Sequence, residues 1–406
     1  MADLRNARLS TGSLVNVTVE GERIRAVGGD LPTAHDAFDC RGRLLLPAFI
    51  DTHVHLDKVL IRDELREHDG TLAGAIGAIQ ERKRAYTVDD VRRRARSVIE
   101  ASVILGTTRL RSHVDVDTIG GLVPLEGVLA AARDCASIAD VEAIAFPQEG
   151  IVRDPGTAAL LRAALEAGAQ VVGGMPHWEL DEPAQREHVR ICFELAERFD
   201  RPLDMHVDET DDGAMRTLEM VADEALRRGW KGRVTAGHVC SLAAADDDYS
   251  ARVIDKCARA EMTIVSNPVT NLVIQGRGDR GLIRRGLTRV AELRAAGVNV
   301  CFGQDCVKDG FYPFGRGDML EVALISAHAA YLATHEELAF ALAAITENAA
   351  QSWNLDDYGI RPGARADLVL VDAPSWEEAL RLQSPRSKVW TRGRPVAETE
   401  VSSRLL

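Results

Sequence analysis

Residues 45–58 read LLPAFIDTHVHLDK, and this stretch indicates the fold. An apolar run leads directly into His53-Val54-His55. Residues i and i+2 of a β-strand point to the same face, so the two imidazoles converge on one point if the run is a strand. Two convergent imidazoles suit a divalent metal ion, whereas the alternative is a solvated pair on an edge strand. The pair alone is a weak signal, and the rest of the chain has to decide between these readings.

Seven further apolar, β-branched segments follow the first one, and stretches with helical periodicity, such as 184–199 and 213–228, lie between them. Strands that alternate with helices predict parallel βαβ units. Eight units over about 290 residues fit a TIM (β/α)8 barrel, in an α/β fold. The expected strands are 44–55, 107–116, 141–148, 171–177, 202–209, 234–239, 263–268 and 298–305.

Both ends of the chain are rich in short β segments instead. They are expected at 14–19 and 23–27 near the N-terminus, and at 366–371 and 387–391 near the C-terminus. Strand-only pieces this short rarely stand alone, so we expect the two ends to pair into one small β-sandwich domain. The expected division is a β-rich domain from 1–45 and 350–406, and a metal-dependent catalytic barrel from 46–349.

Composition narrows the classes of partner. Of 406 residues, 46% are hydrophobic and 27% are charged, which is an ordinary globular balance. The net charge of −13 disfavours nucleic acid and anionic membranes, while small neutral or cationic ligands stay open. The seven cysteines form no CxxC pair, which indicates a reducing, cytoplasmic location rather than a zinc ribbon or a redox site. A secretory signal and a membrane helix are not expected, and a homo-oligomer is possible.

Chemically reactive side chains gather where the expected strands end. Six of the eleven histidines lie there, although the strand ends are a small fraction of the chain. The active site of a TIM barrel is built at the C-terminal ends of its strands. The six are His53, His55, His113, His177, His206 and His238.

Four of the strand-end residues suggest a hydrolytic metal site. His206 can complete a three-histidine set, and Glu209, three residues on, can act as a proton shuttle beside it. His238 ends the sixth strand, and Asp305 ends the eighth, where a carboxylate can bind a metal and accept a proton from its water. Each residue alone could have a purely structural role. Together, however, histidines and an aspartate at successive strand ends of a barrel are improbable by chance.

At these motifs the chain resembles the amidohydrolase superfamily, and within it the bacterial cytosine deaminase branch. The resemblance spans residues 44 to about 320, and the flanking β segments suit the small domain of that family. The matching segments are LLPAFIDTHVHLDK, RSHVDVD, AFPQEGI, VVGGMPHWE, LDMHVDETDD, GRVTAGH, SNPVTNLVIQGR, GVNVCFGQD and YPFGRGDML.

The resemblance implies roles for single residues. It implies that His238 contacts the water on the metal, that Glu209 moves protons on the substrate, and that Gln148 bonds the ring amide of a bound base. The implied metal ligands are His53, His55, His206 and Asp305. The residues that we expect to contact substrate are Gln148, Cys306, Phe146, His177 and Trp178.

The fourth expected strand bears on the number of metal ions. Binuclear relatives use a carboxylated lysine on this strand to bridge two ions, and 171–179 contains no lysine. We therefore expect one divalent ion, and imidazole with carboxylate ligation suits both Zn²⁺ and Fe²⁺.

The expected reaction is hydrolytic deamination of an amino-substituted N-heterocycle with release of ammonia. Cys306 stands where the cytosine deaminase branch usually has a second aspartate, so a related ring such as isoguanine, a pterin, a substituted cytosine or a triazine is favoured over cytosine itself. The alternative is hydrolysis of an exocyclic alkylamine of a triazine, or of a cyclic amide, because RSHVDVD and PFGRGDM also resemble a triazine-hydrolysing enzyme of the superfamily. His113 and Asp115 are expected either to orient a metal ligand or to be structural. Lys58 and Arg277 are expected either to contact substrate or to pair with surface acids, and surface pairing is favoured.

Overall fold

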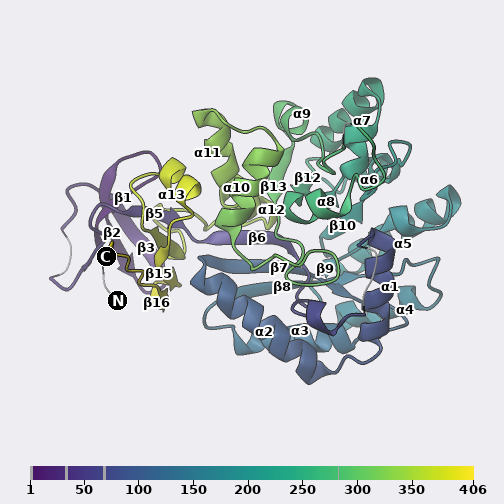
Figure 1. Cartoon of the computed structure of the whole chain (residues 1–406), viewed down its shortest axis with the longest axis horizontal. Coiled ribbons are helices and arrows are strands. Elements are labelled where there is room, and N and C mark those ends of the chain that lie inside the picture. The colour runs from purple at the N-terminus through teal and green to yellow at the C-terminus, as the bar shows by residue number, and fades with distance from the viewer. Residues whose placement is uncertain (1–2, 33–34, 67–69, 282) are drawn as a thin grey trace.

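The computed structural model describes residues 3–32, 35–66, 70–281 and 283–406, and its strands form two sheets (Figure 1). In one sheet, eight strands pair in parallel in the order in which they occur along the chain. A parallel bridge between Val54 and Asp305 joins the two edges, so the sheet closes and the predicted (β/α)8 barrel is confirmed. The strands are β6 (Phe49–Val54), β7 (Thr107–Asp115), β8 (Asp140–Phe146), β9 (Val171–Val172), β10 (Leu203–Val207), β11 (Val234–His238), β12 (Thr263–Ser266) and β13 (Asn299–Phe302).

The second sheet combines both ends of the chain, as predicted, and lies to one side of the barrel (Figure 1). Its strand order is β16-β15-β14-β5-β1-β2-β3, with β4 paired to β1. The strands are β1 (Leu4–Arg8), β2 (Leu14–Glu20), β3 (Arg23–Gly28), β4 (Phe38–Asp39), β5 (Leu44–Pro47), β14 (Leu368–Val371), β15 (Arg386–Thr391) and β16 (Arg394–Glu398).

The expected strand 44–55 is two strands in the structure, and the single-strand prediction is wrong. β5 pairs with β14 in the terminal sheet, whereas β6 pairs with β7 in the barrel. The main chain changes partners within one residue. The amide of Ala48 donates to the carbonyl of Asp367 (3.0 Å), and the amide of Phe49 donates to that of Gly106 (2.9 Å). Both strands are buried, so their apolar pattern runs on without a break.

The expected strand 171–177 is also shorter, because β9 pairs over two residues only. Gly173 then packs directly on the neighbouring strand, where an added Cβ would lie 2.5 Å from the carbonyl oxygen of Ala145. Pro176 has no amide hydrogen for a ladder and instead begins a short 3-10 helix, η2 (Pro176–Trp178).

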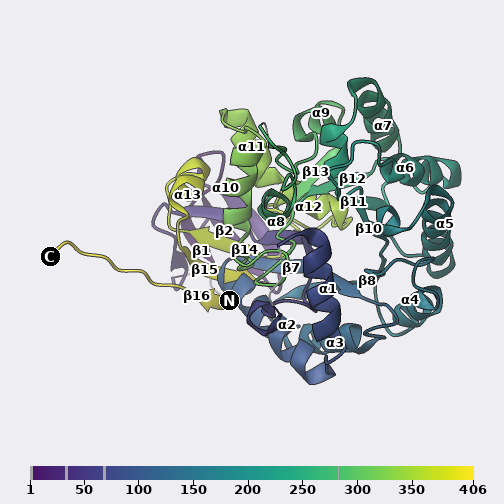
Figure 2. The same ribbon diagram turned by 45° about the vertical axis from the view of Figure 1, so that its right-hand side comes forward.

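Helices surround the barrel strands as an outer layer (Figure 2). Their ends follow local rules, as α5 shows. The side chain of Asp181 accepts a hydrogen bond from the amide of Ala184 at the start of α5, and Asp200 takes a left-handed conformation at its end. The helices are α1 (Leu72–Lys83), α2 (Val88–Ile104), α3 (Val123–Asp134), α4 (Thr157–Glu166), α5 (Glu182–Phe199), α6 (Thr217–Arg228), α7 (Asp247–Arg259), α8 (Pro268–Ile274), α9 (Val290–Ala295), α10 (Met319–Ala329), α11 (His335–Ala343), α12 (Glu347–Ser352) and α13 (Trp376–Leu382), with 3-10 turns η1 (Arg62–Glu64) and η3 (Cys240–Ala244).

The barrel and the terminal sheet share packing. The largest apolar core fills the space around the barrel strands and includes Val369 and Val389 of the terminal sheet. A buried ion pair also links the two parts, because Arg386 of β15 reaches Asp318 at the start of α10 (Nη2–Oδ2 2.5 Å). All seven cysteines are buried free thiols. Within the described ranges, no helix is both long and apolar enough to cross a membrane.

Candidate active site

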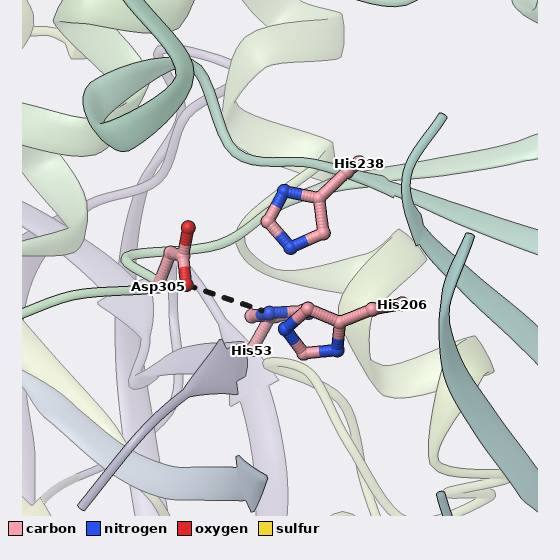
Figure 3. Close-up of side chains that lie close together, drawn as sticks. All are labelled: His53, His206, His238 and Asp305. Atoms are coloured by element: carbon pink, nitrogen blue, oxygen red, sulfur yellow. Dashed lines mark ion pairs between the residues drawn. The ribbon is translucent and has the colours of Figure 1, made fainter. Parts of the chain in front are cut away.

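Four predicted metal ligands converge at the C-terminal mouth of the barrel, and Figure 3 shows three of them together with His238. Nε2 of His55 lies 3.1 Å from Nε2 of His206 and 3.3 Å from Oδ1 of Asp305. Nε2 of His53 lies 3.6 Å from the same Oδ1. The side chains come from β6, from β10 and from the turn after β13, and each residue is buried. The ligands predicted from separate parts of the sequence therefore meet in one place.

The protonation of these groups suits a cation. Burial lowers the pKa of His55 to about 3 and lowers the pKa values of His53 and His206 well below the ordinary value. Burial raises the pKa of Asp305, but His238 and His55 lower it more, to about 2. At neutral pH the three imidazoles are therefore neutral, and Asp305 is an ionised carboxylate.

Several ring nitrogens of the cluster lack hydrogen-bond partners within the protein. Both ring nitrogens of His53, and Nδ1 of His55 and of His206, are buried without a hydrogen-bond partner. Buried polar atoms are normally paired, so this concentration points to a ligand. Imidazole nitrogens with one carboxylate are a donor set that Zn²⁺ and Fe²⁺ accept. The residues at the barrel mouth therefore fit one divalent ion.

Two residues of the cluster stand on left-handed backbone. The φ angle is 69° at His238 and 63° at Asp305. Such angles cost of order 1–3 kcal/mol for a residue with a side chain, and they concentrate at functional sites. Main-chain bonds hold Asp305 in place, since its amide donates to the carbonyl of His53 (2.6 Å) and its carbonyl accepts from the amide of His55 (3.1 Å).

Two glycines make room for the ring and backbone of His53. An added Cβ on Gly237 would lie 2.8 Å from Cε1 of His53, and one on Gly303 would lie 2.7 Å from its Cβ. Real side chains essentially never approach this closely, so both positions exclude larger residues while His53 keeps its place.

Glu209, His238 and Asn271 form a second group of polar side chains beside the predicted ligands. Oε1 of Glu209 lies 3.1 Å from Nδ1 of His238 and accepts a hydrogen bond from Nδ2 of Asn271 (3.0 Å). Burial raises the pKa of Glu209 to about 7. A carboxyl group that titrates near neutrality can both give and take a proton there, as a general acid or base must.

A small cavity lies between these two groups. Its lining combines polar groups of the cluster with apolar side chains such as Met175, Ile274 and Phe311. The full lining is His55, Gln148, Met175, His206, Glu209, Thr270, Ile274, Asp305, Cys306 and Phe311. A lining that mixes polar and apolar groups is typical of sites for small polar ligands.

Comparisons with known proteins agree with this geometry. A family model described as "Amidohydrolase family" matches residues 61–397. The chain belongs to the amidohydrolase family. Within it, this amidohydrolase falls in the cytosine deaminase-like branch, and it is a hydrolase that acts on C–N bonds other than peptide bonds.

Three relatives illustrate the branch. The structure of 5-methylcytosine deaminase from Klebsiella pneumoniae liganded with 5-fluorocytosine is 35% identical, covers 100% of this chain and 99% of its own, and has a TM-score of 0.96. Pterin deaminase of Rhizobium rhizogenes is 34% identical over 88% of this chain and 82% of its own. N-isopropylammelide isopropyl amidohydrolase of Pseudomonas sp. (strain ADP) is 29% identical over 98% of this chain and 97% of its own.

Lys58 of this amidohydrolase is not at the surface, so the expectation that it pairs with surface acids is wrong. It is 1% exposed, and its Nζ donates to Oδ1 of Asp115 (2.7 Å) and to Oε1 of Gln148 (2.9 Å). Burial lowers the pKa of Lys58, but Asp115 and Asp57 raise it above the ordinary value, so the ammonium stays charged. Sequence patterns missed this group, although Lys58 and Asp115 both follow strand-end histidines by two or three residues.

The remaining predicted residues lie near the site without lining the cavity. Phe146 stacks on the ring of His206, with centroids 4.2 Å apart. His177 is buried, and burial lowers its pKa to about 3. Trp178 lies under the guanidinium of Arg153 instead (4.7 Å). The structure brings Gln148 and Cys306 to the cavity and leaves these three outside its lining.

His113 lies behind the ligands, toward the barrel interior. Its ring centroid is 4.2 Å from that of His53, and its Nε2 is 3.5 Å from Oδ1 of Asp204. His113 therefore supports the ring of His53, whereas Asp115 belongs to the Lys58 group. The two residues that sequence reasoning treated together have different surroundings.

Proposed function

We propose that this amidohydrolase is a metal-dependent hydrolytic deaminase that releases ammonia from an amino-substituted N-heterocycle, with a 5-substituted cytosine as the favoured substrate. The observation that carries the proposal is the placement of Glu209. Its carboxyl group, with a pKa of about 7, shares one small cavity with the histidine and aspartate cluster. Proton transfer to a ring nitrogen and attack on the neighbouring carbon need these two groups on one small ring.

Four residues would hold one divalent ion, and both Zn²⁺ and Fe²⁺ suit them: His53, His55, His206 and Asp305. Such an ion supplies a strong nucleophile at neutral pH by lowering the pKa of a bound water.

The chain's own groups handle the protons. The second carboxylate oxygen of Asp305, which points away from His53 in Figure 3, accepts a proton from the attacking water. His238 orients that water from the opposite side. Glu209 gives its proton to the ring nitrogen beside the amino-bearing carbon, which permits a tetrahedral centre there. Asp305 then passes its proton to the amino group, the C–N bond breaks and ammonia leaves. The new hydroxyl group gives its proton to Glu209, so that both carboxyl groups return to their starting states.

The lining of the cavity supports a substituted cytosine. Cys306 is 2% exposed, lines the cavity and lies 3.5 Å from Oδ1 of Asp305 through its Sγ. A thiol is a small, weakly polar group, so this wall suits an apolar substituent better than a ring N–H that needs an acceptor. The likeness to 5-methylcytosine deaminase, at 35% identity over the whole chain, supports the same choice.

An ammonia-release assay tests the proposal. The purified protein is loaded separately with zinc and with iron, and is offered cytosine, 5-methylcytosine, isoguanine, a pterin, an aminotriazine and N-isopropylammelide. We expect ammonia from 5-methylcytosine with the highest kcat/KM of the set. Release of ammonia from none of these compounds, with either metal bound, would contradict the proposal.

A second candidate function keeps the machinery and changes the bond. N-isopropylammelide isopropylaminohydrolase from Burkholderia multivorans is 31% identical, covers 98% of this chain and 99% of its own, and has a TM-score of 0.86. Release of isopropylamine rather than ammonia in the same assay would favour this candidate.

A further inference from the structure

The side-chain amide of Asn271 lies between Glu209 and His238. Its Nδ2 lies 3.0 Å from Oε1 of Glu209, and its Oδ1 lies 3.1 Å from Nδ1 of His238. Asn271 is 1% exposed and belongs to α8. The helix backbone holds it, because its amide donates to the carbonyl of Asn267 (3.1 Å) and its carbonyl accepts from the amide of Gln275 (3.0 Å). One firmly held amide therefore contacts Glu209 and His238 at once.

Hydrogen-bonding capacity determines which end of the Asn271 amide faces which neighbour. An ionised carboxylate only accepts hydrogen bonds, so the Nδ2 end, and not the oxygen, must face Glu209. The Oδ1 end then faces Nδ1 of His238, and Oε1 of Glu209 lies 3.1 Å from the same nitrogen. Both of these oxygens are acceptors, so Nδ1 must carry the hydrogen. In a neutral imidazole the other nitrogen, Nε2, then carries the lone pair.

Nε2 of His238 faces the predicted metal ligands. Figure 3 shows one ring nitrogen of His238 directed toward the other side chains drawn and the other directed away from them. Because Nδ1 faces Asn271, Nε2 is the nitrogen on the ligand side. Nδ2 of Asn267 lies 3.4 Å from Nδ1 and 3.3 Å from Nε2, and these near-equal distances place it over the face of the ring. The Nε2 lone pair is therefore available to accept a hydrogen bond from a water at the metal site.

The two oxygens of Glu209 have different tasks for the same reason. Oε1 is the oxygen that Asn271 and His238 approach, at 3.0 and 3.1 Å. Burial raises the pKa of Glu209 to about 7, so a large share of the carboxyl group is protonated at neutral pH. A hydrogen on Oε1 would point at a donor on either side, so it is carried by Oε2 instead. Glu209 lines the cavity, and Oε2 is the oxygen left for a substrate.

We infer that Asn271 is a positioning residue that keeps Oε1 of Glu209 as an acceptor, so that Oε2 carries the proton for the ring, and keeps His238 in the tautomer with hydrogen on Nδ1. Without this amide, the hydrogen could occupy either oxygen of Glu209 and either nitrogen of His238. Only one of the resulting combinations suits the proposed reaction. The inference rests on the proposed deaminase function, but the tautomer of His238 is measurable without turnover.

The tautomer can be read by ¹⁵N magic-angle-spinning NMR of the zinc-loaded protein with ¹⁵N-labelled histidine. A ring nitrogen that carries hydrogen resonates far from one that does not, and the signals missing from His238→Gln are those of His238. We expect hydrogen on Nδ1 and none on Nε2 in the wild type. In Asn271→Leu the amide acceptor is gone, so we expect a form with hydrogen on Nε2 to become detectable.

Kinetics separate the two halves of the inference. For Asn271→Leu we expect kcat to fall about 10- to 100-fold, while KM changes by less than about threefold. Its zinc content should equal that of the wild type, because the amide contacts Glu209 and His238 rather than a predicted ligand. Asn271→Asp keeps the oxygen for His238 and replaces only the donor to Glu209. In this variant Nδ1 should keep its hydrogen, while kcat falls about 10-fold or more.

Asn16→Asp is the matched control. Asn16 lies in β2 of the terminal sheet, and both ends of its amide are also bonded. Its Oδ1 accepts from the amide of Asn6 (3.0 Å), and its Nδ2 donates to the carbonyl of Leu31 (2.9 Å). We expect kcat and the histidine signals of this variant to equal those of the wild type.

Each outcome decides one claim. Hydrogen on Nε2 of His238 in the wild type overturns the inference, and this measurement needs no variant. Wild-type kcat in a folded Asn271→Leu or Asn271→Asp variant, or a raised KM with unchanged kcat, also overturns it. If Asn271→Leu does not fold, Asn271→Asp and the wild-type spectrum decide. If the wild-type enzyme releases ammonia from none of the compounds tested while Nδ1 carries the hydrogen, the deaminase proposal fails and the tautomer assignment stands.

Discussion

Replacing Gly237 by alanine places a methyl group against the ring of His53. The new Cβ would lie 2.8 Å from Cε1 and 2.9 Å from Nδ1 of that ring, whereas ordinary contacts are about 3.5 Å. The ring must therefore move by about 0.6 Å or more. It has little room to do so, because its centroid lies 4.2 Å from that of His113 and 4.6 Å from that of His206.

A shift of this size exceeds the tolerance of a metal ligand, which is about 0.2 Å. We expect the metal affinity of Gly237→Ala to fall about 10- to 100-fold and kcat/KM to fall about 100-fold. Overpacking should cost about 1–3 kcal/mol of stability, so the variant stays folded if the wild type has an ordinary margin. The loss should therefore appear in metal binding before it appears in the melting temperature.

The assay measures metal content after dialysis against a graded series of chelator concentrations, alongside kcat/KM on the best substrate of the panel. Gly278→Ala is the matched control, since an added Cβ there meets nothing within 4 Å. Wild-type retention of metal by Gly237→Ala, with wild-type kcat/KM, would refute the claim that His53 is a ligand held by close packing on β11.

Three further changes test other parts of the molecule. Glu209→Gln should keep the metal and lower kcat by about 100- to 10,000-fold, as measured by ammonia release and metal analysis; normal turnover would exclude Glu209 as the proton carrier. Cys306→Asp adds an acceptor and removes an apolar wall, so kcat/KM for cytosine relative to 5-methylcytosine should rise about 10-fold in competition assays. Arg386→Met leaves buried Asp318 without this partner and should lower the free energy of unfolding in urea by about 3 kcal/mol, whereas Arg381→Met at an exposed pair should change it by less than about 1 kcal/mol.

The barrel could be predicted from the sequence because its signals are local. Each strand is a short apolar run, and each ends at or is closely followed by a polar residue that has little reason to follow an apolar strand unless it serves a site. His206 and Asp305 were found in this way, although 98 residues of chain separate them. Their convergence follows from parallel strands alone, since the carboxyl ends of all eight meet at one mouth.

The strand limits were harder to predict, because burial on both faces hides them. Leu46 and Ile50 are both buried and apolar, so nothing in their side chains marks the change of sheet at Ala48. The change is a property of main-chain hydrogen bonds, which carry no sequence signature at this position. A continuous apolar run is ambiguous for the same reason in any doubly covered sheet.

The Lys58 group could not be predicted, because its members come from three separate segments. Lysine is mostly exposed in proteins, so the ordinary expectation for Lys58 is the surface. Its burial depends on Asp115 from β7 and on Gln148 after β8 lying on either side of it, which only the barrel geometry provides. A lysine three residues after a histidine pair at a strand end is the one sequence clue available.

The site is held more by backbone than by contacts among its side chains. The ligand imidazoles make few hydrogen bonds within the protein, and His238 and Asp305 stand on unfavourable left-handed backbone. The unpaired nitrogens and the left-handed backbone both cost free energy, and they can persist only because the barrel fixes the strand ends independently of these side chains. One bond that does so runs from the amide of Asp305 to the carbonyl of His53. A cation bound at the proposed site would offset the unpaired nitrogens. It follows that removing the metal should loosen the imidazoles before it loosens the strands, and that packing changes at Gly237 or Gly303 act on the chemistry without unfolding the barrel.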